Sequence, residues 1–596
     1  MNNKLGALLT AASVVGLIGL IYWPVHLADF VWDDQVCMHD AAWLRHGEVW
    51  RQFMAADFCG WKNYFRPVIV AMFATELRLF DVTPGPMHLI SLGFHLANTL
   101  LVGLLAITLS TVRRRQTIII AGGAMTFYGL HPALIEPVAW ISCRADLVVT
   151  FIVLLGLLAN ARIQRVLLRA FVVAVCFFVA ASAKESAVTF PVLLLLFDWI
   201  GMEPAQSERG FFEQVRVLVQ RQWPVYAATL CAGIAYLAMR YDALGFLLND
   251  TTSIPLPLAP RLQSVAYILL TYWRILAWPM TGLAPTHDVD PQRFETFNTA
   301  IASIDLAALA IVLAGLYGTF KRNPFGYAIL AVNVALFPVL HILPVHFDPS
   351  LYHERYLMLG LALAMALVPR MAAAISLPAE KLRTASIGGA ALGLLWLSAA
   401  VINIRVTLPL WSNSIRLWQW DLQKNPQSSI AKTNLLALYI DHEDRVHAHE
   451  LADQLLAEED TCSLCLINVA VLAMDEGDLK RAEMALNRAR AAMGNQIIPY
   501  VWQSFVMNKG RLRELEHDPV EAAKDYQEAI TMDPLDPKLR MALALFLARQ
   551  GNVAEARAAM DETLPLWPPD MRAIRQREFE RTLAAATQSA PAQHQP

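Results

Sequence analysis

Long apolar runs occupy residues 1–404 of this 596-residue sequence and limit what it can fold into. A helix that crosses a lipid bilayer needs about 20 mostly apolar residues, and its backbone hydrogen bonds must close within the segment. The sequence therefore predicts an all-α fold that begins with a polytopic membrane bundle of about eleven spans. Runs of the required kind lie near 5–23, 87–110, 116–134, 143–161, 167–183, 186–201, 223–239, 301–319, 325–343, 355–371 and 384–404.

The remaining third of the chain differs in composition. The whole sequence is 56% hydrophobic and 17% charged, yet its polar residues concentrate after residue 404. We expect a connector at 405–429, a soluble helical domain at 430–585 and a disordered tail at 586–596. The net charge is −3, and no basic stretch is interleaved with aromatic residues, which argues against nucleic-acid binding.

Alanines recur through the soluble domain with spacings of 34, 40 and 34 residues. These residues are Ala448, Ala482, Ala522 and Ala556. The six extra residues in the middle interval are assigned to an insertion around Leu512 to His517. A 34-residue period is that of the tetratricopeptide repeat, in which helical hairpins stack into a superhelix with a concave groove. Such a groove could hold an extended peptide, or the domain could be an oligomerisation surface.

The distribution of Lys and Arg predicts the orientation of the spans, because cytoplasmic loops are enriched in these residues. Basic clusters occur at 113–115, 162–169, 209–221, 321–322 and 370–383. They share one side only if Ser264 to Leu283, with Arg274 in its middle, does not cross the bilayer. The N-terminus would then be cytoplasmic, with the repeat domain outside the cytoplasm.

An acidic pair, Asp33 and Asp34, follows the first apolar run at the start of the predicted first outer loop, residues 24–86. Adjacent carboxylates at a membrane boundary pay for desolvation and mutual repulsion. One interpretation is a general base, or a ligand for a metal or acceptor, on the outer face of a membrane enzyme. The other is a solvated loop that marks the end of the helix.

Further charged and histidine residues gather on the same predicted outer face. The candidates are Arg66, His131, Glu136, Arg144, Asp146, Lys184, Glu185, Arg240, His353, Glu354 and Arg355. Each is either part of a functional cavity or a structural ion pair. In the structural alternative, His131 makes an internal hydrogen bond and Glu136 pairs with Arg144.

Cysteines provide two further hypotheses. Cys37 and Cys59 share the predicted outer loop, where a disulfide is plausible. Cys462 and Cys465 form a lone CxxC, and without further ligands at suitable spacing they favour helix packing, reduced or oxidised, over zinc. No metal site is evident in the residue pattern, although a divalent metal stays open.

An ordered series of motifs resembles one known family. The series is Trp32-Asp33-Asp34, Tyr64-Phe65-Arg66-Pro67, Gly93 to Asn98, His131 to Ala139, Arg144 to Leu147, Lys184-Glu185 and His353 to Leu357. In order and approximate spacing it resembles the transmembrane and tetratricopeptide-repeat-containing O-mannosyltransferases and their bacterial relatives. The resemblance covers nearly the whole chain, although Cys143 stands where a glycine is expected.

This resemblance implies a GT-C-type glycosyltransferase, a hexosyltransferase that uses a polyprenyl-phosphate-linked sugar on the extracytoplasmic face. It implies that Asp33 or Asp34 is the catalytic base or binds a metal. We expect a bacterial inner membrane with the repeats in the periplasm; an endoplasmic reticulum location with luminal repeats would keep the same topology.

In the mechanism that follows, cations meet the phosphate leaving group and a carboxylate takes the proton of the acceptor hydroxyl. The phosphate ligands would be Arg144, Lys184, Arg240 and Arg355, with Arg144 and Arg355 favoured. The cavity would be lined by Arg66, His131, Glu136, Asp146, Glu185, His353 and Glu354. A single displacement at the anomeric carbon would invert its configuration.

Three readings of the function remain. The acceptor could be a protein Ser or Thr, which is favoured, or a glycan or lipid of a surface polysaccharide. In the third reading the chain is a non-catalytic membrane scaffold that displays the repeats. A transporter is disfavoured because the sequence has no duplicated halves with matching interrupted spans.

Overall fold

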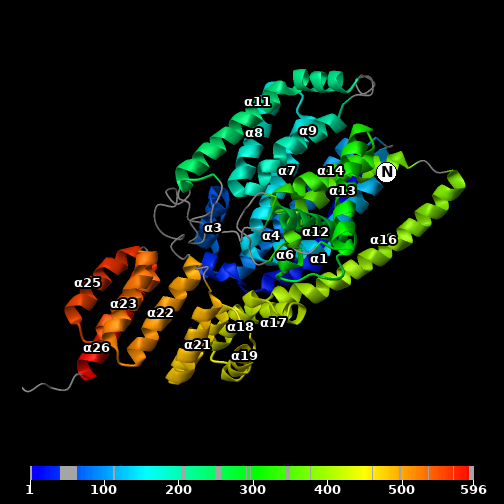
Figure 1. Ribbon diagram of the computed structural model, residues 1–596. Coiled ribbons are helices and arrows are strands. Elements are labelled where there is room, and N and C mark those ends of the chain that lie inside the picture. Colours follow the sequence, from blue (N-terminus) through cyan, green and yellow to red (C-terminus); the bar gives the residue numbers. More distant parts are fainter. Residues whose placement is uncertain are drawn as a thin grey trace, which may run out of the picture. The chain divides into compact units, whose positions relative to one another are not determined.

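The fold is known from a computed structural model (Figure 1). It describes residues 3–39, 64–111, 114–202, 210–247, 257–289, 291–294, 297–342, 350–375, 378–459, 461–494, 498–534, 536–567 and 569–589. Every regular element in these residues is a helix, which confirms the predicted all-α class. The chain forms two compact units, and the second begins at Trp418, a few residues into the predicted connector.

Fourteen α-helices lie in the described residues of the first unit. They are α1 (Asn3–Tyr22), α3 (Pro67–Phe80), α4 (Pro84–Leu109), α5 (Arg114–Gly129), α6 (Ile135–Ala139), α7 (Arg144–Arg162), α8 (Val166–Ala183), α9 (Phe190–Ile200), α11 (Phe211–Leu244), α12 (Leu258–Ala277), α13 (Thr299–Phe320), α14 (Pro324–Leu336), α15 (Met358–Ala374) and α16 (Ala379–Thr407). Proline opens α3, α4 and α14, where its fixed φ suits the first helical position and its missing N–H costs nothing.

Seven helices in the described residues are long and apolar enough to cross a membrane. They are Leu5–Leu27, Pro84–Leu109, Ile141–Arg162, Val166–Ala183, Thr299–Phe320, Glu354–Ala374 and Thr384–Trp411. The pair Gln116–Gly129 and Pro132–Ala139, bent by 56°, makes an eighth if it counts as one span.

The count of about eleven spans is therefore not reached in the described residues. The run 186–201 breaks into a 3-10 turn, η6 (Glu185–Thr189), and α9 of 11 residues. At 1.5 Å per residue α9 extends only about 16 Å, which is too short to cross a bilayer. The run 325–343 contains α14, which has 13 residues, and 223–239 lies inside the less apolar α11.

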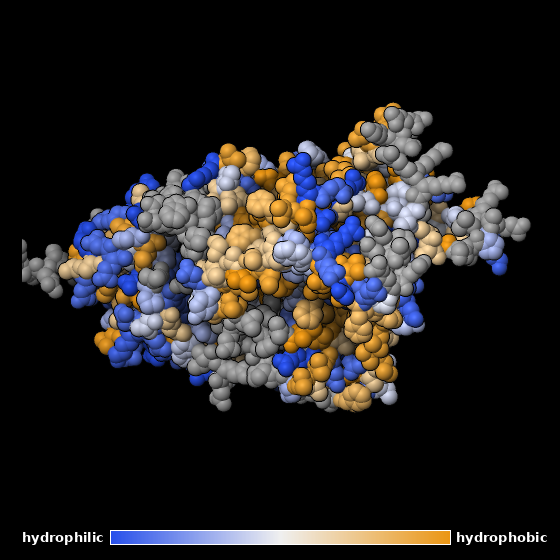
Figure 2. All heavy atoms as spheres, turned by 90° about the horizontal axis from the view of Figure 1, so that it is seen from above, coloured by the Kyte–Doolittle hydropathy of each residue, from blue (hydrophilic) through white to orange (hydrophobic). Residues whose placement is uncertain are grey.

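The candidate spans divide into central and peripheral helices. In the most apolar window of Ile141–Arg162, 78% of residues are buried, whereas only 6% are buried in that of Thr384–Trp411. The peripheral helices α1, α13 and α16 therefore present apolar side chains on the outside of the unit. Figure 2 shows such residues across the surface in view. An apolar surface of this extent is suited to lipid rather than water.

The second unit consists of helical hairpins, which run from yellow to red in Figure 1. The paired helices are α18 (Ser429–Asp441) with α19 (Arg445–Ala457), α20 (Ser463–Asp475) with α21 (Leu479–Ala492), α22 (Pro499–Leu515) with α23 (Pro519–Met532), and α24 (Pro537–Arg549) with α25 (Val553–Thr563). The recurring alanines lie one on each second helix, and all four are fully buried. The predicted repeat is thus present as helical hairpins.

The turns inside the first three hairpins have a common construction. Asp444, Asp478 and Asp518 cap the second helix by accepting a hydrogen bond from the backbone N–H three residues later. The residue before each cap has a positive φ, which Gly477 adopts without strain. His517 occupies the equivalent position with φ +63°, so this turn is preserved rather than expanded.

Two sequence assignments in this unit need adjustment. The extra residues of the long interval lie mainly in α22, which has 17 residues against 13 in α20, and not around Leu512 to His517. A helix can lengthen by a turn without disturbing the buried face that sets the period. The last helix, α26 (Pro569–Ser589), continues past the expected start of the tail at residue 586; residues 590–596 lie outside the described part.

Candidate functional site

Asp34 ties the segment after α1 to the turn before α7. Its carboxylate Oδ1 accepts hydrogen bonds from the Ser142 N–H at 2.7 Å and the Ser142 hydroxyl at 2.5 Å. Its Oδ2 accepts from the N–H of Ile141 at 3.2 Å and of Val31 at 3.4 Å. The side chain is fully buried, and burial raises the pKa of Asp34 from 3.8 to about 6, although these hydrogen bonds act in the opposite direction.

Asp33 has a different environment from its neighbour, because it is only half-buried. The residue before it, Trp32, has φ +54°, an unfavourable conformation for a bulky side chain. The Trp32 indole stacks on that of Trp140, with ring centroids 4.4 Å apart and planes within 5°. The stacked rings hold Trp32 in this strained conformation. The conformation sets the directions in which the side chains of the acidic pair leave the backbone.

A row of four alternating charges is built from the starts of four separate helical segments. Arg355, in η9 (Glu354–Leu357), donates from its guanidinium to Glu136 Oε1 and from its backbone N–H to Glu136 Oε2 at 2.9 Å. Its Nε lies 3.9 Å from Asp146 Oδ2. The ammonium of Lys184 donates to both Asp146 oxygens, at 2.7 and 2.8 Å. We call Glu136, Arg355, Asp146 and Lys184 the charged row; its formal charges cancel.

Aromatic rings cover the cations of the charged row. The Arg355 guanidinium lies 5.0 Å from the Trp140 ring centroid and 4.7 Å from that of Tyr356. The Lys184 ammonium lies 4.8 Å from the same tyrosine ring. Trp140 is also the ring on which Trp32 stacks, so aromatic contacts connect the charged row to the strained residue beside Asp33.

Two arginines converge on one carboxylate beside this row. Arg66 donates to Glu185 Oε2 from Nη2 at 3.0 Å and from Nε at 3.3 Å, and Arg240 donates to Oε1 at 3.2 Å. Although burial opposes it, the two guanidiniums hold the pKa of Glu185 below its usual value. We call Arg66, Glu185 and Arg240 the arginine pair; it carries a formal charge of +1. The Glu185 side chain is 32% exposed, more than either arginine.

Arg144 lies apart from these groups. It does not pair with Glu136, so that part of the structural alternative is wrong. Its guanidinium donates to the Glu76 carboxylate, to Ser91 Oγ at 3.0 Å and to the Met87 carbonyl at 2.7 Å. The side chain is fully buried. These contacts use all three guanidinium nitrogens and fasten α3 and α4 to α7, so Arg144 has the environment of a structural residue.

The remaining predicted residues also make internal contacts. Nε2 of His131 lies 3.2 Å from the Leu276 carbonyl oxygen and its Nδ1 accepts from the Ala133 N–H, the hydrogen-bonded arrangement expected in the structural alternative. Glu354 Oε1 lies 2.7 Å from His287 Nε2. His353 Nδ1 lies 3.5 Å from Glu136 Oε1, at the end of the charged row.

The sequence did not reveal the aromatic rings that cover the charged row, or the serine that donates hydrogen bonds to Asp34. Trp140 and Tyr356 both lie next to, or within, motifs that the sequence had singled out for their charges. Ser142 had no signal, because its importance depends on an acid 108 positions earlier. Glu76 was visible as a charge within the short apolar helix α3, and a carboxylate in such a helix calls for a cation.

No group of three or more His, Cys, Asp or Glu residues in the described ranges is arranged to hold a metal ion. Cys462 and Cys465 form a disulfide at the start of α20. Cys37 is disulfide-bonded. Its suggested partner, Cys59, lies outside the described ranges, so the pairing stays a prediction.

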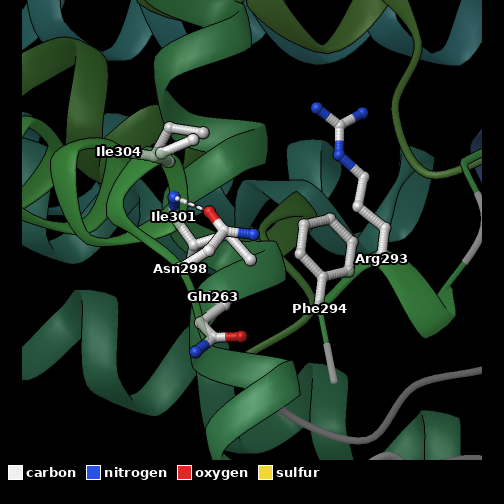
Figure 3. Close-up of a pocket in the computed structure, with 7 residues that line it drawn as sticks. Gln263, Arg293, Phe294, Asn298, Ile301 and Ile304 are labelled. Atoms are coloured by element: carbon white, nitrogen blue, oxygen red, sulfur yellow. Dashed lines mark hydrogen bonds between the residues drawn. The ribbon is translucent and has the colours of Figure 1, made fainter. Parts of the chain in front are cut away.

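A small cavity of about 130 Å³ lies between α12, η7 (Pro291–Phe294) and α13 (Figure 3). Gln263, Phe294 and Asn298 surround it, and the Asn298 side chain caps α13 by accepting from the Ile301 N–H at 3.0 Å. None of the residues proposed from the sequence lines this cavity.

Comparison with known proteins identifies part of the second unit. The family model described as tetratricopeptide repeat matches residues 511–570, which include α23, α24 and α25. No curated protein gives a significant match to the chain. Tetratricopeptide repeats generally mediate protein–protein interactions, so a protein partner is consistent with this unit.

Proposed function

We propose that this chain is an integral-membrane glycosyltransferase that transfers a hexose from a polyprenyl phosphate to an acceptor hydroxyl. The observation that carries the proposal is the arginine pair beside the charged row. Two guanidiniums share one partly exposed carboxylate, and the pair keeps a formal charge of +1. The ordered motifs that resemble the GT-C O-mannosyltransferases supply the reaction class.

Arg66 and Arg240 are the proposed phosphate ligands, in place of Arg144. Their present ligand, Glu185, is an anion of the kind that a phosphate would displace, and guanidiniums bind phosphate oxygens in the same forked geometry as carboxylate. Lys184 and Arg355 lie nearby in the charged row, where Asp146 and Glu136 neutralise their charges. Arg66 and Arg240 stabilise the negative charge that grows as the donor bond breaks.

Asp33 is the proposed general base, and Asp34 positions it. All the hydrogen bonds given for the Asp34 carboxylate are internal, whereas Asp33 is half-buried. The acceptor oxygen attacks the anomeric carbon while its proton passes to the Asp33 carboxylate. The bond from that carbon to the phosphate oxygen breaks, and the phosphate leaves with the electron pair. A single displacement inverts the anomeric configuration.

A protein Ser or Thr is the proposed acceptor, because the chain carries a repeat unit of a kind that generally binds proteins. The alternative acceptor is a surface glycan or lipid. A membrane scaffold without catalysis is the second candidate function, and the tetratricopeptide match favours it as well. An extracytoplasmic face of a bacterial inner membrane is the proposed place of action.

The deciding experiment deletes the gene in its host and profiles extracytoplasmic glycoproteins and surface glycans by mass spectrometry. The deletion is complemented with wild type, with Asp33→Asn and with Asp242→Asn, an exposed carboxylate at the end of α11 that serves as the matched control. We expect a hexose-sized mass to disappear and to return with wild type and Asp242→Asn only. Losing the base should lower transfer by about 100-fold or more.

Each outcome separates the hypotheses. Full restoration by Asp33→Asn would show that Asp33 is not the base. If no glycan changes on deletion, the transferase proposal fails, and partner capture by the chain that survives Asp33→Asn would support the scaffold. Treatment of the purified protein with EDTA, followed by single divalent ions, tests the open question of a metal.

A further inference from the structure

A second concentration of charge lies at the other end of the helices that carry the proposed site. A cavity of about 310 Å³ opens between the ends of α4, α7, α9 and α15 and the nearby turns of α8 and α11. Its polar lining includes Arg169, Arg221, Arg370, Asp198 and Gln222. We call this cavity the arginine pocket.

The carboxylate in the described lining of this pocket accepts hydrogen bonds from neutral donors. The Asp198 carboxylate accepts hydrogen bonds from the Asn160 amide at 2.7 Å, the Gln222 amide at 3.2 Å and the Tyr226 hydroxyl at 2.9 Å. Among the lining residues that the structure describes, three arginines and one aspartate have a formal charge of +2.

Two of the pocket arginines, Arg169 and Arg370, donate to neutral acceptors. Arg169 donates to Gln222 Oε1 at 2.8 Å and to the Ile163 carbonyl at 3.3 Å, while its buried Nε–H has no acceptor among the described residues. Arg370 donates to the carbonyls of Leu109, at 2.6 Å, and Ile200, at 3.0 Å. These contacts fix the guanidiniums in place without neutralising them.

Two further arginines stand around the rim. Arg162 donates to the hydroxyl of Thr108, a lining residue, at 2.8 Å. Arg322 donates to the Trp199 carbonyl and the Gln214 side chain, both at 2.5 Å, and its Nε–H also lacks an acceptor in the described part. Like Arg169 and Arg370, neither has a described carboxylate within 4.0 Å, so positive charges accumulate here.

Part of the remaining lining is apolar, and the position of the pocket suits an amphiphile. Leu105, Leu157 and Phe197 contribute the apolar wall. The pocket lies at the end of α7, whose beginning carries Asp146 of the charged row, so the two sites are separated by roughly 20 Å along the helix. A candidate span therefore places the pocket near the opposite membrane surface. Basic pockets between membrane helices bind anionic headgroups.

We propose that the arginine pocket binds a phosphate group, carried by an anionic lipid of the adjacent leaflet. Arg169 and Arg221 contact the phosphate oxygens, and the apolar wall receives the first part of the acyl chains. This site is separate from the proposed donor site and does not depend on the transferase activity. Free phosphate shares the same chemistry, and the test distinguishes the two sources.

The test uses the purified full-length chain in phosphatidylcholine nanodiscs. Phosphatidylglycerol and, separately, inorganic phosphate are titrated, and bound ligand is measured by native mass spectrometry. The variant is Arg169→Gln/Arg221→Gln. The control is Arg216→Gln, an exposed arginine on α11 outside the pocket. We expect the double variant to weaken phosphatidylglycerol binding about tenfold or more, with no change for the control.

The two titrations distinguish a lipid ligand from a soluble one. Saturable phosphatidylglycerol binding that is lost in the double variant supports the lipid source; phosphate binding alone, lost in the same way, supports the site and assigns it a soluble ligand. Equal binding by wild type and the double variant overturns the proposal, as does absence of binding in both arms. If the double variant does not fold, Arg221→Gln alone and the loss of wild-type binding in high salt replace it.

Discussion

At the residue scale, the adjacent acids Asp33 and Asp34 have different environments. Asp34 is a buried acceptor of four hydrogen bonds, whereas Asp33 is half-buried and is the proposed base. Sequence alone could not separate them, because both follow the same apolar run and differ only in which side chain turns inward. The strained conformation of Trp32 decides that direction.

The first prediction concerns Asp34→Asn. The amide would turn an N–H₂ group toward backbone N–H donors, so we expect the free energy of unfolding at pH 7 to fall by about 1–3 kcal/mol. Asp242→Asn, a change at an exposed carboxylate of α11, should leave it nearly unaltered. Chemical denaturation in detergent micelles measures both.

A comparison of wild type with Asp34→Asn at several pH values tests the raised pKa of Asp34. A carboxyl group that ionises at about 6 when folded and at 3.8 when unfolded stabilises the fold at low pH, and this contribution is lost as the pH rises through 6. The advantage of wild type over Asp34→Asn should therefore widen by about 2 kcal/mol between pH 7 and pH 4. An advantage that does not vary with pH would contradict the raised pKa.

A second prediction concerns the ion pair between Arg144 and Glu76. Arg144→Gln leaves a buried carboxylate without its cation, so we expect a loss of about 3–5 kcal/mol in stability. The double variant Arg144→Gln/Glu76→Gln should recover part of that loss. Thermal melting of the three proteins provides the measurement, and a single variant as stable as wild type would show that the pair is not structural.

At the element scale, the repeats were predictable and the partners of the charges were not. The spacing of small residues identifies the hairpins because burial on the second helix repeats with the period of the unit. Arg144 was matched with Glu136, eight residues away, but α6 turns that carboxylate toward Arg355, 219 positions later in the chain. Such pairings depend on the packing of helices, which periodicity does not reveal.

The predicted number of spans is not reached in the described residues for a related reason. A hydropathy run has a length in residues, but its reach depends on whether the backbone stays helical throughout. Lys184 and Glu185 lie where the chain leaves the helix before α9, and this break shortens the apolar run that follows. The same break turns both side chains toward the candidate site, so the charges that define the site also interrupt the span.

The third prediction tests the buried face of the repeats. Ala482 on α21 is fully buried, and Ala482→Leu should overpack the hairpin and lower its stability by about 1–3 kcal/mol. Ala491, exposed on the same helix, accepts the same change as a control. Limited proteolysis of the full chain should show faster cleavage within the second unit for Ala482→Leu only.

At the scale of the whole molecule, the first unit has two polar ends joined by apolar helices. One end carries the charged row and the arginine pair, and the other carries the arginine pocket. The helix α11 extends between them, with Arg240 near one end and Arg216 near the other, and its 34 residues measure about 51 Å. If the unit crosses a membrane, these two ends lie on opposite sides.

The fourth prediction follows from that arrangement. Asp242→Cys and Arg216→Cys, each combined with Cys231→Ala to remove an exposed native thiol, should differ in access to a membrane-impermeant thiol reagent on intact cells. We expect labelling of Asp242→Cys and protection of Arg216→Cys until the cells are opened. Equal labelling of both would refute the transmembrane arrangement.

The Asp34 contacts also constrain when the segment after α1 can become fixed during synthesis. Their partners Ile141 and Ser142 come 107 and 108 residues later, so Asp34 emerges from the ribosome long before either exists. Until then its carboxylate has only Val31 within reach among those partners, and it must stay hydrated. The first helix of this protein can enter a membrane early, but the segment behind it becomes fixed only after the start of α7 has been translated.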